Sequence, residues 1–113
     1  MDFYEYENAA ASTAIYPESG QSSLTALNYT VLGLCGEAGE IANKVKKIYR
    51  DKGGVLSLED RAEISKEIGD VLWYLARASA ELGYTLEEIA DYNAEKLLDR
   101  QSRGVLAGNG DNR

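Results

Sequence analysis

Two short acidic motifs could bind a metal ion. Glu37 and Glu40 stand three residues apart, as do Glu67 and Asp70, and each pair encloses a glycine. Side chains at positions i and i+3 project from one side of a helix, so each pair can direct two carboxylates at one point. Four converging carboxylates repel one another, and they stay ionised together only when a cation neutralises them. Because magnesium prefers oxygen ligands, the four residues predict a magnesium site in which manganese could substitute.

Apolar residues recur at three- and four-residue spacing around both motifs, which predicts helices. The predicted fold is all-α, a four-helix bundle with a long antiparallel central hairpin in a single domain of residues 1–113. Residues 104–113 have no helical period, and we expect them to form an irregular tail. The first expected helix covers residues 2–14, and the second begins at Ser22 or Ser23 and ends at about Asp51. A capping box at Ser57 opens the third helix, which Gly83 ends. A capping box at Thr85 opens the fourth helix, which ends at about Arg103.

Composition excludes several classes of function. The net charge of −7 argues against general affinity for nucleic acid polymers or anionic membranes. No apolar run approaches the roughly 18 residues of a membrane span, and the N-terminus lacks the pattern of a secretory signal. Cys35 is the only cysteine, so no disulfide can form within the chain, and it is expected to face the core as an inert thiol. The cytoplasm is the expected compartment.

Helical phase places both acidic pairs on one flank of the central hairpin. At roughly 100° per residue, each pair lies beside the apolar stripe of its helix, rotated in the same sense. The short connection at residues 52–57 favours antiparallel helices, and flanks of like sense then fall on the same side. The midpoint of that turn lies between Gly53 and Gly54. At equal distances from it along the two helices lie Glu40 and Glu67, and likewise Glu37 and Asp70, so we expect each of these pairs to lie at the same height along the hairpin.

The fourth helix carries three further polar residues that could lie near the acids. If it returns along the third helix, Lys96 falls near the level of Asp70 and Arg100 near that of Glu67, with Asn93 about a turn away. Asn93 is a polar residue within an apolar stripe. Burying an unpaired amide costs about 1 to 3 kcal/mol, so we expect Asn93 to have a specific partner near the carboxylates.

Non-catalytic interpretations remain open. Glu40 and Lys44 have the spacing of an ordinary helical ion pair, and Glu63, Lys66 and Glu67 could form a solvated flank. A carboxylate-bridged di-iron bundle is disfavoured because such sites use Glu-x-x-His motifs and the chain has no histidine. The remaining alternative is a non-enzymatic helical dimerisation module.

The second half of the third helix is apolar on nearly all sides, which predicts a partner subunit in addition to an internal core. Trp73 is expected on the side of this helix opposite the acids, where packing against a second subunit is favoured over stacking on a base. Tyr16 is expected to pack in the core, although it could border a bound base.

Three segments together resemble a known family. The chain is similar to small single-domain MazG-type nucleotide pyrophosphohydrolases of bacteria and phages, and the resemblance extends from about Thr13 to Arg113. The acidic spacing alone is common on helices, whereas its combination with the downstream Asn and Lys is specific. The segments are Gly36-Glu37-Ala38-Gly39-Glu40, Lys66-Glu67-Ile68-Gly69-Asp70-Val71-Leu72-Trp73-Tyr74 and Asn93-Ala94-Glu95-Lys96-Leu97.

This resemblance implies hydrolysis of a nucleoside triphosphate between the α and β phosphates, giving the monophosphate and pyrophosphate, as in housecleaning of nucleotide pools. It also implies a homodimer or homotetramer. One of the carboxylates, or Glu63, would accept a proton from the attacking water. The implied magnesium ligands and catalytic residues are Glu37, Glu40, Glu67 and Asp70, and the implied substrate-binding residues are Asn93, Lys96, Arg100, Lys44 and Lys47.

Overall fold

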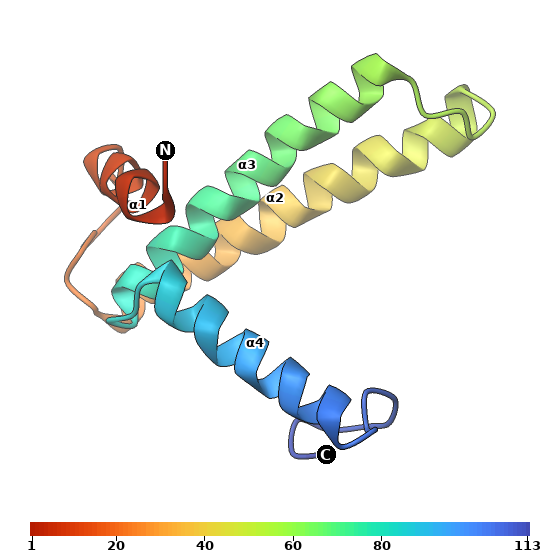
Figure 1. Ribbon diagram of the computed structural model, residues 1–113. Coiled ribbons are helices and arrows are strands. Elements are labelled where there is room, and N and C mark those ends of the chain that lie inside the picture. The colour runs from red at the N-terminus through yellow and green to blue at the C-terminus, as the bar shows by residue number, and fades with distance from the viewer.

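The computed structural model describes all residues, 1–113, and contains four helices and no strand. The prediction of an all-α fold is therefore confirmed. Two long helices form a hairpin, and two shorter helices branch from one end of it (Figure 1). In chain order the helices are α1 (Phe3–Ser12), α2 (Leu24–Asp51), α3 (Leu58–Glu81) and α4 (Leu86–Ser102).

Side chains cap the helices where the sequence predicts. Ser23 precedes α2 and accepts a hydrogen bond from the first turn of that helix. Ser57 and Asp60 form a reciprocal capping box at the start of α3. The box expected at α4 is incomplete: the Thr85 hydroxyl accepts from the Glu88 backbone N–H, but the Glu88 carboxylate accepts from that same hydroxyl and not from the Thr85 backbone.

The hairpin of α2 and α3 is antiparallel, as expected from its short connection (Figure 1). Gly53 and Gly54 have φ angles of +60° and +78°, a region that residues with a Cβ rarely adopt. The Gly54 N–H donates to the carbonyl of Ile48 over 3.1 Å, which satisfies one of the last acceptors of α2. The two glycines therefore allow α3 to turn back directly along α2.

An ion pair joins the two ends of this connection and should make stability depend on pH. Hydrogen bonds from Lys52, and then from Ser57, lower the pKa of Asp60 from 3.8 to about 2. Because the folded-state pKa lies below the unfolded-state value, ionised Asp60 stabilises the fold above about pH 4, and this contribution is lost as the pH falls towards 2. We expect Asp60→Asn to lower the melting temperature at pH 6 and to match the wild type near pH 2, in melts followed by circular dichroism.

The exposed neighbour Glu59 provides the control for this prediction. Glu59→Gln makes the same charge change without removing a capping group or a partner of Lys52. A melting-temperature gap for Asp60→Asn that stayed constant between pH 6 and pH 2 would contradict the assignment.

The first helix contacts both α3 and the start of α4. It lies beside the C-terminal half of α3 (Figure 1) and also contacts α4. The Glu7 carboxylate accepts a hydrogen bond of 2.8 Å from the Leu86 N–H, one of the first N–H groups of α4 that have no acceptor within the helix. α1 thereby fixes the direction in which α4 leaves the turn at Gly83.

The fourth helix diverges from the hairpin, which corrects the expectation that it returns along α3. It touches α1 and α3 near the shared turn but does not contact α2 (Figure 1). A short turn allows antiparallel packing but does not impose it. Here the turn and the Glu7 bond instead direct α4 outward, so a single chain does not close into a compact bundle.

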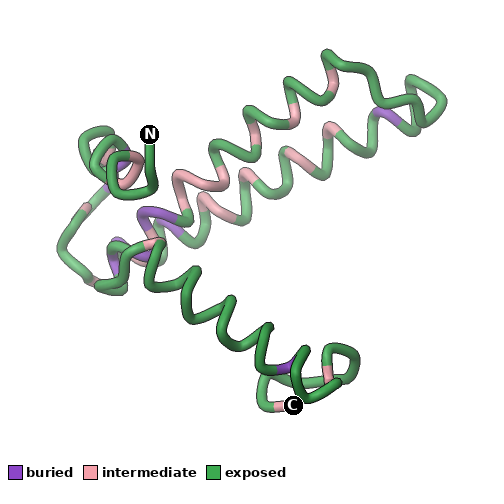
Figure 2. The backbone as a smooth tube through the Cα atoms, in the orientation of Figure 1, coloured by how far each residue is buried: buried purple, intermediate pink, exposed green.

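The single chain is unusually open. Its radius of gyration is 17.1 Å, whereas a compact domain of this length has about 13 Å. Only 10 of 113 residues are buried, and most of them lie where α1, the segment after it and one end of the hairpin meet (Figure 2). α4 is exposed along nearly its whole length. None of the four helices combines the length and apolar character that a bilayer crossing demands.

Candidate metal site

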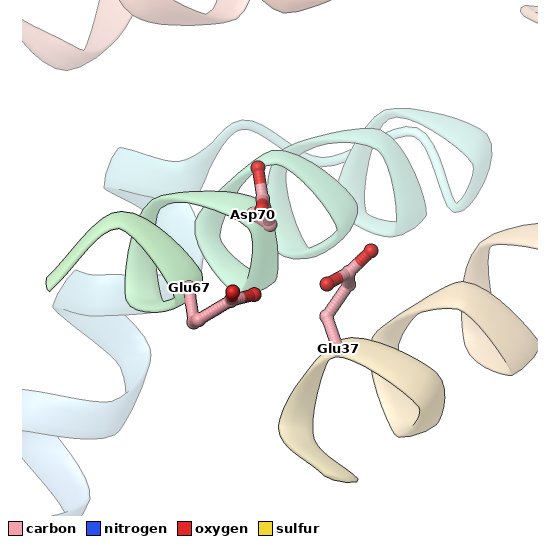
Figure 3. A group of neighbouring side chains, drawn as sticks. All are labelled: Glu37, Glu67 and Asp70. Atoms are coloured by element: carbon pink, nitrogen blue, oxygen red, sulfur yellow. The ribbon is translucent and has the colours of Figure 1, made fainter. Parts of the chain in front are cut away.

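Three carboxylates converge between the two long helices. Glu37 projects from α2 towards α3, which carries Glu67 and Asp70 (Figure 3). One carboxylate oxygen of each residue lies within 4.8 Å of the others. Glu37 and Glu67 are half-buried and Asp70 is exposed, so the cluster opens to solvent on one side. The structure thus brings together three of the four acids selected from spacing and helical phase.

Glu40 lies outside this group. It is exposed on α2, one turn beyond Glu37. The expected pairing of Glu40 with Glu67 is replaced by an arrangement in which Glu37 faces both acids of α3. Partial burial, followed by the charges of Asp70, Glu67 and Glu40, raises the pKa of Glu37. All four charges therefore act on one point, although only three of the side chains meet there.

The donor set suits a hard divalent cation. All the ligand atoms are carboxylate oxygens, and the chain has no histidine that would favour zinc or iron. Oxygens on opposite sides of an octahedral magnesium ion lie about 4.2 Å apart. Oxygens spread over at most 4.8 Å can reach that spacing through small side-chain rotations. The residues present consequently fit magnesium.

Two lysines of α2 lie near the acids: Lys44 lies beside Glu67, and Lys47 lies one turn closer to the hairpin turn. Lys44 Nζ is 3.5 Å from a Glu67 oxygen, so the ordinary ion pair between Lys44 and Glu40 is not the one that forms. Lys47 lines a neighbouring depression of about 390 Å³ together with Lys44 and Glu63. Glu63 accepts a 2.9 Å hydrogen bond from Lys66, which lowers its pKa. A lowered pKa makes Glu63 a weaker candidate for the general base.

A depression with aromatic walls adjoins the carboxylates. It has a volume of about 340 Å³ and is lined by Thr13, Glu37, Asp70, Trp73 and Tyr74. The Trp73 indole N–H donates to the Thr13 hydroxyl over 2.9 Å, and its ring meets that of Tyr74 edge to face. Trp73 therefore lies on the side of the acids, which corrects its expected place opposite them. The spacing of Asp70 and Trp73, i and i+3, was the available signal.

Gly33 makes the position of Tyr74 possible. A Cβ atom at Gly33 would lie 2.1 Å from the Tyr74 ring, so only glycine lets this ring rest on the backbone of α2. We expect Gly33→Ala to destabilise the fold by about 1 to 3 kcal/mol because the ring must move. Chemical denaturation measures this change.

Gly36 supplies the matched control, because a Cβ there meets nothing within 4 Å. Gly36→Ala should stabilise the helix by about 0.5 to 1 kcal/mol through higher helix propensity. Equal effects of the two substitutions would show that Tyr74 does not occupy the space above Gly33.

The structure does not bring the three predicted residues of α4 to the acids. Asn93 and Lys96 line an apolar groove of about 670 Å³ between α3 and α4. Lys96 and Arg100 lie 3.8 and 3.7 Å from a carboxylate oxygen of Asp111 in the tail, which folds back over the end of α4. The Arg100 side chain is buried there and also donates to the Asp111 carbonyl. Within one chain, therefore, neither Asn93, Lys96 nor Arg100 lies beside the carboxylates as predicted.

Sequence reasoning missed residues that patterns of apolar spacing do not reveal. Tyr6 of α1 lies close enough to Asp70 that burial, and then the Asp70 charge, raises its pKa. Arg77 and Glu81 are buried near the end of α3, although charged residues on a helix normally indicate a solvated face. Cys35, expected in the core, is exposed.

Comparison with known proteins identifies relatives of this chain. The family model described as the MazG nucleotide pyrophosphohydrolase domain matches residues 25–105. The Gene 37 protein of Mycobacterium phage L5 is 50% identical over 109 residues, which cover 96% of each chain. No solved structure matches the chain. The matched residues include all four acids of the two motifs and the segment from Asn93 to Arg100.

Proposed function

Because the chain belongs to the MazG nucleotide pyrophosphohydrolase family, we propose that it hydrolyses ribo- or deoxyribonucleoside triphosphates between the α and β phosphates. The products are the monophosphate and pyrophosphate. The observation that carries this proposal is the meeting of Glu37, Glu67 and Asp70 between two antiparallel helices, beside a depression large enough for part of a nucleotide. The reaction depends on magnesium, for which manganese can substitute.

Glu37, Glu67 and Asp70 would hold the metal ion, and Glu40, exposed one turn further along α2, would be the fourth ligand. When bound, magnesium neutralises phosphate charge, orients the phosphate chain and lowers the pKa of an attacking water. The clustered carboxylates supply the negative charge that attracts the cation. A carboxylate oxygen that faces solvent, such as one of Asp70, can accept the proton of the attacking water.

Substrate phosphates carry more charge than the metal ion alone can balance, so cationic side chains must contribute. Lys44 lies beside Glu67, and Lys47 follows one turn further along α2. Lys96 and Arg100 of α4 flank the carboxylate of Asp111, an anion within the chain itself, and this supports a phosphate-binding role for them. Asn93 lies on the same helix and would bind sugar or phosphate. Because α4 does not reach the carboxylates of its own chain, Asn93, Lys96 and Arg100 would bind substrate at the site of a second chain.

A second copy of the chain is proposed as the partner that covers the groove between α3 and α4. A folded monomer of 12.4 kDa has an accessible surface of about 6100 Å². The surface of this chain is 7968 Å², an excess of about 1900 Å². A standard interface covers about 800 Å² on each partner, and permanent homodimers cover more. The excess therefore suits a permanent homodimer, or a tetramer built from two such pairs.

The proposed setting is control of nucleotide pools in the cytoplasm, where a reduced Cys35 needs no disulfide partner. The alternative to an enzyme is a helical dimerisation module with acids that are merely exposed. The alternative predicts no binding of nucleotide in the presence of metal, so calorimetric titration of a non-hydrolysable triphosphate with magnesium separates the two.

The decisive experiment is a product assay. The protein is incubated with standard, deoxy and oxidised nucleoside triphosphates plus magnesium, and the products are separated by ion-exchange chromatography. Monophosphate and pyrophosphate in equal amounts are expected, and chelation of the metal should abolish both. Diphosphate and orthophosphate as products would overturn the proposed bond cleavage, and turnover that survives chelation would overturn the role of the metal.

A further inference from the structure

Two charged side chains are buried near the end of α3, away from the proposed metal ligands. Glu81 is 3% exposed and Arg77, one turn before it, is 6% exposed. Burial of charged groups in an apolar interior costs several kcal/mol unless partners compensate, and apolar residues of similar volume usually stabilise a fold as well or better. One oxygen of Glu81, Oε2, has no hydrogen-bond partner. The stability of the fold alone therefore does not explain why charged residues occupy these two buried positions.

Both side chains bind the segment that connects α1 and α2. Glu81 Oε1 accepts hydrogen bonds from the Tyr16 hydroxyl, over 3.2 Å, and from the backbone N–H of Gly20. Arg77 Nε donates to the Tyr16 hydroxyl over 3.2 Å, and its guanidinium lies 3.7 Å from Glu81 Oε1. The hydroxyl of Tyr16 is thus held from both sides, and the connecting segment is fastened to α3 at two points.

The fastened segment in turn positions the aromatic wall beside the carboxylates. The Tyr16 ring stacks on Tyr29 at 5.1 Å and meets the Trp73 ring edge to face at 6.2 Å. Thr13, at the start of the same segment, accepts the hydrogen bond of the Trp73 indole. The polar and aromatic contacts of Trp73 with this segment therefore both depend on where residues 13–20 lie.

We infer that Arg77 and Glu81 are positioning residues, which fix Tyr16 and Thr13 so that Trp73 and Tyr74 keep an aromatic wall for the nucleoside part of the substrate. The inference rests on the proposed function. A triphosphate whose phosphates lie at Glu37 and Asp70 has its nucleoside beside Trp73, because these residues line one depression. Stacking of a base on an aromatic side chain is worth about 1 to 3 kcal/mol, so a displaced wall weakens nucleotide binding measurably.

The test compares a ligand that has a base with one that lacks it. The ligands are a nucleoside triphosphate analogue with a methylene group between the α and β phosphates, and inorganic triphosphate, both with magnesium. Trp73 is the only tryptophan, so its fluorescence reports both the wall and the binding. The variants are Glu81→Gln, which removes the charge but keeps an acceptor, and Tyr16→Phe, which keeps the ring and removes the bridging hydroxyl.

Each variant should shift the emission of Trp73 and weaken the analogue about tenfold, while the affinity for inorganic triphosphate stays within about twofold of the wild type. In turnover, KM should rise by a similar factor with little change in kcat. Glu87→Gln, at an exposed carboxylate in the first turn of α4, should behave as wild type. Tyr16→Phe retains the packed ring, so it keeps the test valid if Glu81→Gln does not fold.

Two results would overturn the inference. Variants that bind both ligands as tightly as the wild type would show that the network does not influence the site. Equal weakening of both ligands would show a general structural role with no preference for the nucleoside. Failure of the wild type itself to bind the analogue would instead overturn the proposed function, so the two failures are distinguishable.

Discussion

Asp70→Asn and Glu67→Gln should each lower kcat for triphosphate hydrolysis by at least about a hundredfold, with helical content unchanged. Changes around metal ligands already cost 10- to 100-fold in metal affinity or activity, and loss of a ligand should cost more. Each substitution removes a charge from a cluster whose oxygens lie within 4.8 Å of one another, and leaves side-chain volume almost unchanged. Steady-state turnover, magnesium titration and circular dichroism measure the three quantities.

Two further substitutions test which acids belong to the metal site. Glu40→Gln should also reduce turnover strongly if Glu40 completes the site, whereas near-normal turnover would restrict the ligands to the three that meet in the structure. Glu87→Gln is the control, because Glu87 is exposed in the first turn of α4 and lies outside the cluster, so this variant should retain most of the activity. Normal turnover in Asp70→Asn would remove the metal-site assignment altogether.

Ile89→Asp should convert the proposed homodimer or homotetramer to monomers and lower the melting temperature by ten degrees or more. Ile89 lines the groove between α3 and α4, which is largely apolar and about 670 Å³ in volume. A carboxylate there would have to be desolvated on association, at a cost of several kcal/mol, and a shift of about 4 to 8 °C per kcal/mol is typical of domains of this size. Light scattering coupled to gel filtration gives the mass.

Val55→Asp places the same new charge on an exposed residue at the hairpin turn and should leave the assembly intact. A wild-type protein that runs as a monomer at micromolar concentration would contradict the proposed second copy. If Ile89→Asp also loses turnover while its hairpin remains helical, the residues of α4 act in a site shared between subunits.

Local structure could be predicted because its signals are local. The caps Ser23, Ser57 and Thr85 and the turn at Gly53 and Gly54 are each recognisable within four residues, and the helices begin and end close to them. The meeting of the acids followed from two further quantities, the helical repeat and the length of one turn. They were sufficient to bring Glu37, Glu67 and Asp70 together, because the α2 and α3 hairpin is regular, but they did not predict that Glu40 lies outside the cluster.

The direction of α4 and the wall around Trp73 could not be predicted, for different reasons. The apolar face of α4 indicates that it is covered, but not whether α3 or another subunit covers it. The Glu7 bond that directs α4 joins residues 79 positions apart and leaves no periodic signal. Arg77 and Glu81 resemble residues of a solvated face, since only the distant Tyr16 explains their burial.

The bond between Glu7 and Leu86 also has a consequence for the order of folding. Contacts close in sequence form early, because closing a long loop costs chain entropy before any contact repays it. The α2 and α3 hairpin needs only a six-residue connection, whereas the Glu7 bond encloses most of the chain. We therefore expect the carboxylates to meet early in folding, and α4 to acquire its direction last.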